Sequence, residues 1–205
     1  MILNDFNVDP AKVQPIAFLG NRARKLLRSS INQDRYRQAI DIFSTHANPR
    51  AAWNAFTVVG SSDDGIILER ECILEGSVIM DEGKNAALIV LGVCTIGGEV
   101  EHEMGRVMDE GNNFLAYLID AMASWGTTET RKQCIKKIKD DEIMSDGIAG
   151  RIFRPGQAGW DIGVQSTIFE LLDADVESIG VSLDPGTMIM HPLKSASFAF
   201  FKFDR

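Results

Sequence analysis

Nine residues near the middle of the chain, 86–94, are continuously apolar apart from Gly92. A run of this length and composition is typical of a strand that is buried on both faces. Such a strand suits a central position in a sheet, with other elements packed around it. The run therefore makes a sheet the centre of any fold that this chain can adopt.

A second patterned region, Phe169–Phe201, lies close to the C-terminus. An apolar helical start is followed by a short strand over 179–183, a Met-rich turn that ends at His191-Pro192, and a further apolar run over 195–201. Period-two patterning beside Gly and Pro predicts two strands joined by a defined loop.

The remaining segments add helices to these strands. Helical spacing of apolar residues and terminal charges predicts helices over 21–45, 99–109, 114–139 and 164–173. A short strand is expected over 66–68 and a short amphipathic segment over 72–80, whereas 51–59 fits either a helix or a strand. Residues 147–163 are predicted to be a Gly-rich connection.

Composition narrows the class of protein. With 205 residues we expect a single domain, residues 1–205, in which 1–20 form an extended N-terminal arm. The net charge of −8 would repel phosphate backbones, so a nucleic-acid partner is not expected. The sequence shows neither a signal peptide nor an apolar stretch of membrane-spanning length, which predicts a cytoplasmic protein without a membrane partner. Three widely spaced cysteines without a CxxC pair fit a reducing compartment.

The Gly-rich connection contains the best candidate for a binding site. It carries Arg151 and Arg154, whose planar guanidiniums suit a carboxylate. Loops that are held by a rigid sheet are also where ligand contacts concentrate. The alternative is a surface turn whose arginines pair with nearby acids of the 140–142 segment.

Other constellations in the sequence do not indicate chemistry. The three histidines are far apart and lack the HExxH spacing of a zinc helix, so no metal site is predicted. Ser195 and Ser197 have no evident histidine and acid partners, and we predict no catalytic residue.

Several stretches, in order, resemble the activation (reactivation) domain of cobalamin-dependent methionine synthase. The C-terminal region matches the family pattern as FELL, IGVSL, MIMHP and KSAS. Residues 87–97 resemble the apolar strand of the family that ends in T-I-G, and 113–129 (NFLAYLIDAMASWGTTE) resembles its long central helix. The resemblance covers about residues 70–201 and implies an α+β fold, with a mixed or antiparallel twisted sheet and helices packed around it.

The same resemblance implies a ligand. In the family, the Gly-rich connection carries an R-x-x-P-G-Y type motif that holds S-adenosylmethionine, with the arginine on the ligand's carboxylate. Pro155 and Gly156 match this motif, and Gln157 stands at the tyrosine position. The arginines are offset, since Arg151 lies five residues before Gly156 and Arg154 two before it.

A glutamate on the long helix of the family suits the ribose hydroxyls, because an ionised carboxylate only accepts hydrogen bonds. The aligned position here is Thr128, and Glu129 follows it directly. The cofactor-binding residues implied by the resemblance are therefore Glu129, Arg151 or Arg154, Pro155, Gly156 and Gln157.

The implied function is that of a stand-alone activation domain. It would dock on a corrinoid protein or methyltransferase and help to return oxidised cobalamin, carried by that partner, to the methylated state. The methyl group would come from S-adenosylmethionine and one electron from a reductase such as flavodoxin. Any enzymatic activity would thus be associated with methyl transfer in methionine biosynthesis. The alternative is a non-catalytic module that binds a corrinoid protein and has lost S-adenosylmethionine binding.

Overall fold

The computed structural model describes residues 1–69 and 72–205. Its centre is a seven-stranded sheet in the order β4-β3-β2-β5-β9-β6, with β1 paired to one end of the long β2. Every strand pair is antiparallel. The strands of this sheet are β1 (Ile2–Leu3), β2 (Arg50–Ser61), β3 (Gly65–Leu68), β4 (Cys72–Glu75), β5 (Leu88–Thr95), β6 (Gly147–Phe153) and β9 (Ser195–Asp204).

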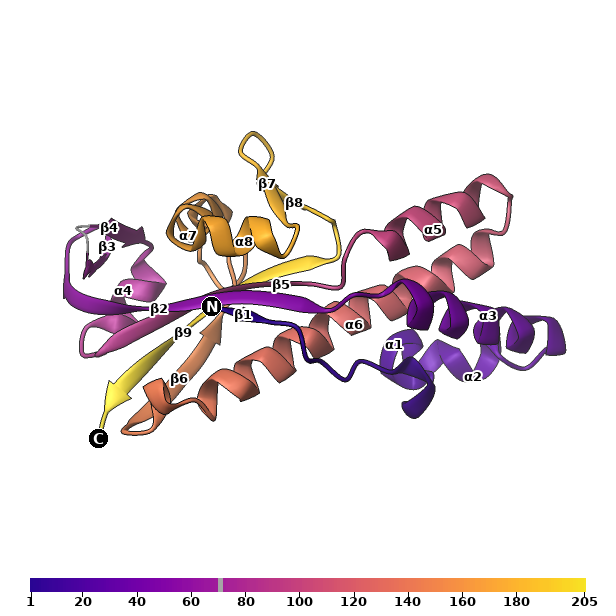
Figure 1. The fold of residues 1–205 in the computed structure, drawn as a ribbon, viewed down its shortest axis with the longest axis horizontal. Coiled ribbons are helices and arrows are strands. Elements are labelled where there is room, and N and C mark those ends of the chain that lie inside the picture. The colour runs from indigo at the N-terminus through magenta and orange to yellow at the C-terminus, as the bar shows by residue number, and fades with distance from the viewer. Residues whose placement is uncertain (70–71) are drawn as a thin grey trace.

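Helices cover both faces of the sheet and continue beyond its edge (Figure 1). The long helix α6 runs along one face, and α4, α7 and α8 lie over the other, beside a separate hairpin of β7 and β8. Near the far end of α6, the helices α1, α2, α3 and α5 gather around it. The bounds are α1 (Ile16–Leu19), α2 (Ala23–Leu26), α3 (Ser30–His46), α4 (Ser77–Gly83), α5 (Glu99–Asp109), α6 (Asn113–Lys139), α7 (Gln165–Leu172), α8 (Ala174–Ser178), β7 (Ser182–Asp184) and β8 (Ile189–His191). Short 3₁₀ turns occupy η1 (Pro10–Lys12), η2 (Gly20–Arg22), η4 (Glu142–Met144) and η5 (Ile162–Val164).

The central apolar strand is confirmed as β5, which lies between β2 and β9. Its alternate residues enter different cores: Ile89 and Leu91 pack on the α7 side, whereas Val90 and Cys94 pack on the α6 side. Both faces of the strand are thus buried, which explains why its sequence is continuously apolar rather than alternating.

The C-terminal strand β9 is also buried on both faces. In β9, Phe198 and Phe200 belong to the core under α6, and Phe201 belongs to the core under α7. Side chains of a strand point alternately to its two faces, so one short aromatic run fills both layers. The predicted α+β architecture is confirmed in these two central strands and in α5 and α6, whose bounds agree with the predicted helices to within one residue.

Three predictions of secondary structure are wrong. The Gly-rich segment 147–163 is not all connection, because its first seven residues form the edge strand β6. The predicted helix 21–45 is broken, and its long part begins only at Ser30, where the Ser29 side chain caps the helix by accepting a hydrogen bond from the amide of Asn32. The predicted strand 179–183 begins at Ser182, because α8 extends to Ser178.

The first residues of the chain pair with the sheet, and the first helix comes later in the sequence. β1 pairs with β2, and the N-terminal amine lies 2.6 Å from the Asp175 carboxylate. Residues 4–9 have no regular secondary structure, and η1 and α1 follow, so the extended arm expected over 1–20 does not continue through these residues. Residues 70 and 71, where the family resemblance begins, lie outside the described residues. Within the described chain, no helix combines the length and the apolar character that a membrane crossing requires.

Gly92 shows how closely the two central strands approach, and it yields a test. A Cβ atom placed on Gly92 would lie 2.3 Å from the ring of Phe198 in the neighbouring strand. We expect Gly92→Ala to lower the free energy of unfolding by about 1–3 kcal/mol, because the buried ring has to shift. The matched control is Gly105→Ala in α5, where a Cβ meets nothing within 4 Å. There the same exchange should stabilise the protein by about 0.5–1 kcal/mol. Urea denaturation measures the free energy of unfolding of both variants. Equal changes in the two would contradict the close packing of Gly92 against Phe198.

Candidate functional site

The two arginines of the predicted site lie on opposite sides of the sheet edge. Residues 151 and 153 point to one face of β6, and 152 and 154 to the other, as strand alternation requires. Arg151 donates toward Glu82 of α4, with 3.2 Å between Nε and Oε2, and its guanidinium stacks 4.5 Å from the ring centre of Phe153. Arg151 is therefore engaged on the α4 side.

Arg154, by contrast, lines a pocket between the end of β6 and the long helix α6. The pocket has a volume of about 330 Å³. Two isoleucines form its apolar walls, and three cationic side chains line the rest. We call it the cationic pocket; its lining residues are Arg131, Lys132, Ile135, Ile152 and Arg154.

No acidic side chain is among the residues that line this pocket. Among the residues that the structure describes, no carboxylate forms an ion pair with Arg131 or Arg154. Burial lowers the pKa of the Arg131 guanidinium, and the nearby charge of Arg154 lowers it further. A half-buried cation, Arg131, and an exposed one, Arg154, that repel each other form a site for an anionic group.

Glu129, predicted for the ribose, lies beside the cationic pocket but does not line it. Its carboxylate is 3.6 Å from the Lys132 ammonium and accepts a hydrogen bond from the side-chain amide of Gln133. Gln133 in turn exchanges two hydrogen bonds with the backbone of Asn7. The Glu129 carboxylate therefore lies on the side of α6 that contacts Asn7 in the N-terminal segment. Of the residues that line the pocket, it contacts Lys132.

The predicted turn Pro155–Gln157 follows directly after Arg154. Pro155 is buried, and Gly156 has φ +78°, a conformation that favours glycine. The Gly156 amide donates to the Trp160 carbonyl at 2.8 Å, and the Gln157 amide donates to the Arg154 carbonyl at 3.1 Å. Both amides are thus used within the turn, and a ligand would meet carbonyl groups and the exposed Gln157 side chain there.

Trp160 anchors this turn to the body of the protein. Its indole is 2% exposed, packs edge-on against Phe153 and donates from Nε1 to the Glu75 carbonyl at 2.9 Å. A second hollow, of about 600 Å³, opens beside the turn and is lined by Gly156, Gly159, Trp160, Asp161 and Ile162. The chain therefore places Arg154 in one hollow and Gly156, two residues later, in the next.

Sequence reasoning missed Arg131 and Lys132 as site residues. Both were interpreted only as cations near the C-terminus of a helix, where the helix dipole favours them. The available signal was the position of Arg131, four residues before Ile135 and therefore on the same face of α6. That face carries the buried residues Cys134, Ile135 and Ile138 toward the sheet. A charged residue on an apolar stripe is the kind of exception that marks a site.

The described residues contain no cluster of three His, Cys, Asp or Glu side chains that could hold a metal ion. His46 lies at the end of α3, His102 on α5 and His191 on β8. The three cysteines are free, and burial raises the pKa of the Cys94 thiol to about 12, which suits a core residue rather than a nucleophile.

Comparison with known proteins identifies the fold. No protein-family model and no curated protein matches the sequence. Among solved structures, the chain is similar to the MetH reactivation domain crystallised with AdoHcy. The TM-score is 0.64 and the sequence identity is 18%, over 88% of this chain and 69% of that one. The chain therefore has the α+β fold of the MetH reactivation domain, as its resemblance to the methionine synthase activation domain predicted.

Proposed function

We propose that this chain is a relative of the methionine synthase activation domain and that it binds S-adenosylmethionine or its product AdoHcy. The observation that carries the proposal is the cationic pocket, which lies between α6 and β6 on the fold of a domain that was crystallised with AdoHcy. Arg154 from the predicted motif and Arg131 from the long helix would both face the carboxylate of the ligand.

The rest of the ligand follows from the neighbouring surface. With the carboxylate at Arg154, the nucleoside would lie along the hollow beside the Pro155–Gly156 turn. Carbonyl groups of this turn can accept hydrogen bonds from the adenine amino group. Gln157, at the position of the family's tyrosine, offers an amide instead of a ring, and Glu129 could reach the ribose only if it left Lys132.

The role of such a complex would be to position the methyl donor for a partner protein that carries cobalamin. The C–S bond of S-adenosylmethionine breaks and leaves its electron pair on sulfur, which yields AdoHcy. The partner's cobalamin, reduced by one electron from a flavodoxin-like reductase, would supply the electron pair that accepts the methyl group, and Arg154 and Arg131 would hold the donor in place for it. The chain's own contribution is binding and orientation, because the cofactors perform the chemistry.

A second candidate is a module that keeps the fold and docks on a corrinoid protein without binding S-adenosylmethionine. Three observations favour it: Gln157 replaces the ring of the motif, Arg151 is paired with Glu82, and the amides of Gly156 and Gln157 donate within their own turn.

Titration calorimetry with AdoHcy and S-adenosylmethionine distinguishes the two candidates. We expect both to bind, and AdoHcy to bind about three- to tenfold more tightly. The reason is that the donor's sulfonium adds a positive charge beside the cationic pocket, and one close pair of like charges in water costs roughly 1 kcal/mol, or about fivefold in affinity. An absence of heat with both ligands at millimolar concentration would rule out the first candidate and leave the second. A pull-down with a corrinoid protein then tests the docking role.

A further inference from the structure

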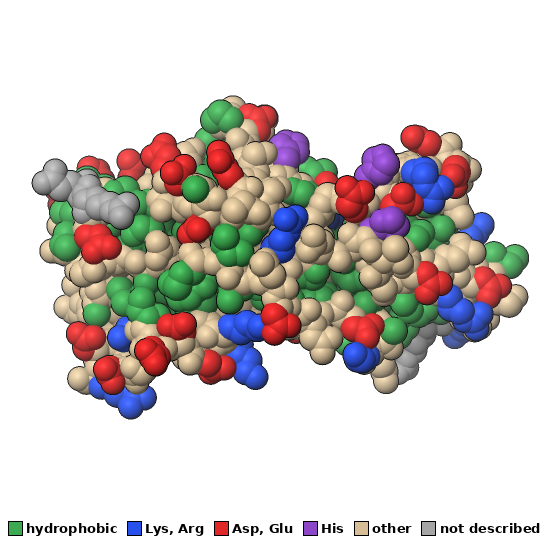
Figure 2. All heavy atoms as spheres, in the orientation of Figure 1, with side chains coloured by type: hydrophobic (Ala, Val, Ile, Leu, Met, Phe, Trp, Pro, Cys, Tyr) green, Lys and Arg blue, Asp and Glu red, His purple; other side chains and the backbone are tan. Residues whose placement is uncertain are grey.

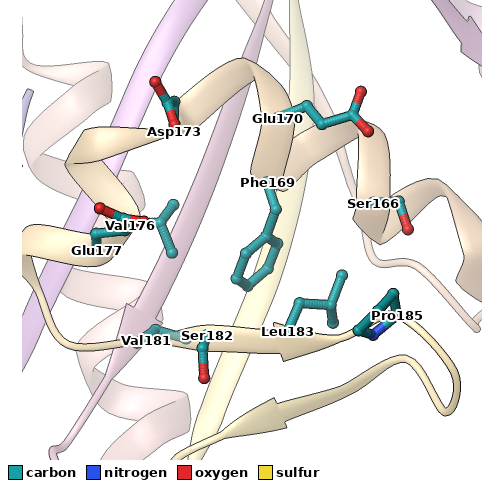
Figure 3. A pocket seen from close by; sticks show the side chains of 10 residues that line it. All are labelled: Ser166, Phe169, Glu170, Asp173, Val176, Glu177, Val181, Ser182, Leu183 and Pro185. Carbon is teal, nitrogen blue, oxygen red and sulfur yellow. The ribbon is translucent and has the colours of Figure 1, made fainter.

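A further pocket lies in the α7–α8 layer, which covers the face of the sheet opposite to α6 (Figure 1). It is open to solvent, has a volume of about 390 Å³ and is formed by α7, α8 and β7. Figure 3 shows its side chains, with the ring of Phe169 reaching from α7 into the space above β7. We call it the acid-rimmed pocket; its lining residues are Ser166, Phe169, Glu170, Asp173, Val176, Glu177, Val181, Ser182, Leu183 and Pro185.

The centre of the acid-rimmed pocket is apolar. Phe169 and Leu183 are half-buried, and Val176 and Val181 are buried. The first pair leaves an aromatic ring and an aliphatic side chain accessible from solvent. Such a surface can take up the hydrocarbon part of a ligand, and an aromatic face also attracts a cation.

The rim carries three carboxylates, which belong to Glu170 on α7, Glu177 on α8 and Asp173 between the two helices (Figure 3). No lysine or arginine is among the lining residues, and within the described chain none of the three carboxylates forms an ion pair. Asp175, in the same segment, does form an ion pair: its carboxylate lies 2.6 Å from the N-terminal amine. Figure 2 shows acidic side chains over this part of the surface.

We infer that the acid-rimmed pocket binds a small organic cation, namely an ammonium or guanidinium group carried on an apolar body. Its charge complements the three carboxylates, and its body fits the surface of Phe169 and Leu183. The volume falls in the range of small-molecule sites, about 300–1,000 Å³. A protein partner would need an interface of roughly 1,000 Å² or more, and this pocket alone does not supply it. The inference is independent of the proposed function, since the cationic pocket lies on the other face of the sheet.

The experiment uses 2-phenylethylammonium as the probe and its neutral analogue 2-phenylethanol, with binding followed by NMR titration of the full chain. We expect the ammonium to shift resonances of α7, α8 and β7, with an affinity at least tenfold higher than that of the alcohol. The double variant Glu170→Gln/Glu177→Gln should weaken ammonium binding at least tenfold. The matched control Glu142→Gln, an exposed acid on η4, should leave it within twofold.

Four results would overturn the inference. Equal affinity for the alcohol would show a merely apolar groove, and an equal loss in Glu142→Gln would show a general charge effect. Shifts outside the α7, α8 and β7 segments would place the cation elsewhere. Binding of a tri-arginine peptide without binding of the ammonium would assign the pocket to a protein partner.

Discussion

Arg154→Gln should weaken the binding of AdoHcy by about tenfold to a hundredfold, because a hydrogen bond to a charged group contributes roughly 1.5–3 kcal/mol. The side chain lies in the cationic pocket, is exposed and has no ion-pair partner within the described chain, so its removal should not disturb folding. Glutamine keeps a polar side chain of moderate length but removes the charge and the planar donor fork. Titration calorimetry on the wild-type and variant chains measures the effect, and circular dichroism checks the fold.

The control for this prediction is Arg151→Gln, because the chain offers two arginines three residues apart. Arg151 faces α4, pairs with Glu82 and stacks on Phe153. Its substitution should leave the affinity for AdoHcy within about twofold. If instead Arg151→Gln abolished binding and Arg154→Gln did not, the ligand would lie on the α4 side of the sheet edge, and the proposed site would be wrong.

Trp160→Ala should lower the free energy of unfolding by about 3–5 kcal/mol, which is typical of the loss of a fully buried tryptophan. The indole packs on Phe153 and covers Gly76, whose Cβ, if present, would lie 2.8 Å from the indole ring. It also holds the turn that follows Arg154, since the Trp160 carbonyl accepts the hydrogen bond from the Gly156 amide. Removing the ring therefore leaves a cavity between β6 and the β4–α4 segment. Denaturant unfolding followed by circular dichroism provides the measurement.

Trp160→Phe separates packing from hydrogen bonding in this contact. Phenylalanine keeps most of the ring but leaves the Glu75 carbonyl without the indole donor, which should cost about 1–2 kcal/mol. A loss as large as that of Trp160→Ala would mean that the hydrogen bond, rather than the buried ring, secures the turn. A loss near zero in both variants would contradict the buried position of Trp160.

The parts of the fold that could be predicted are those in which one periodicity extends over many residues. β5, α5 and α6 have such patterns, and their positions follow from buried apolar runs and from charges at helix ends. β6 could not be predicted, because glycine and charged residues are uncommon in strands and, of its residues, only Phe153 is buried in a core and Ala149 packs against another. Its pairing with β9 forms the strand, and that contact spans about fifty residues of sequence.

The side of the sheet to which each arginine points could not be predicted for a related reason. The register of β6 against β9 shifts between Ala149 and Ile152. A one-residue irregularity exchanges the two faces of a strand for every residue that follows it. The choice between Arg151 and Arg154 therefore depends on a bulge that no local sequence pattern reveals. Arg131 was missed because a cation near the C-terminus of a helix is already explained by the helix dipole.

A crystal structure of this chain grown with AdoHcy would test the position of the binding site most directly. We expect the ligand between α6 and the end of β6, with its carboxylate within hydrogen-bonding distance of the Arg154 guanidinium and with Arg131 beside it. A ligand bound on the α4 side at Arg151, or an empty cationic pocket at saturating AdoHcy, would contradict the claim that this pocket is the binding site.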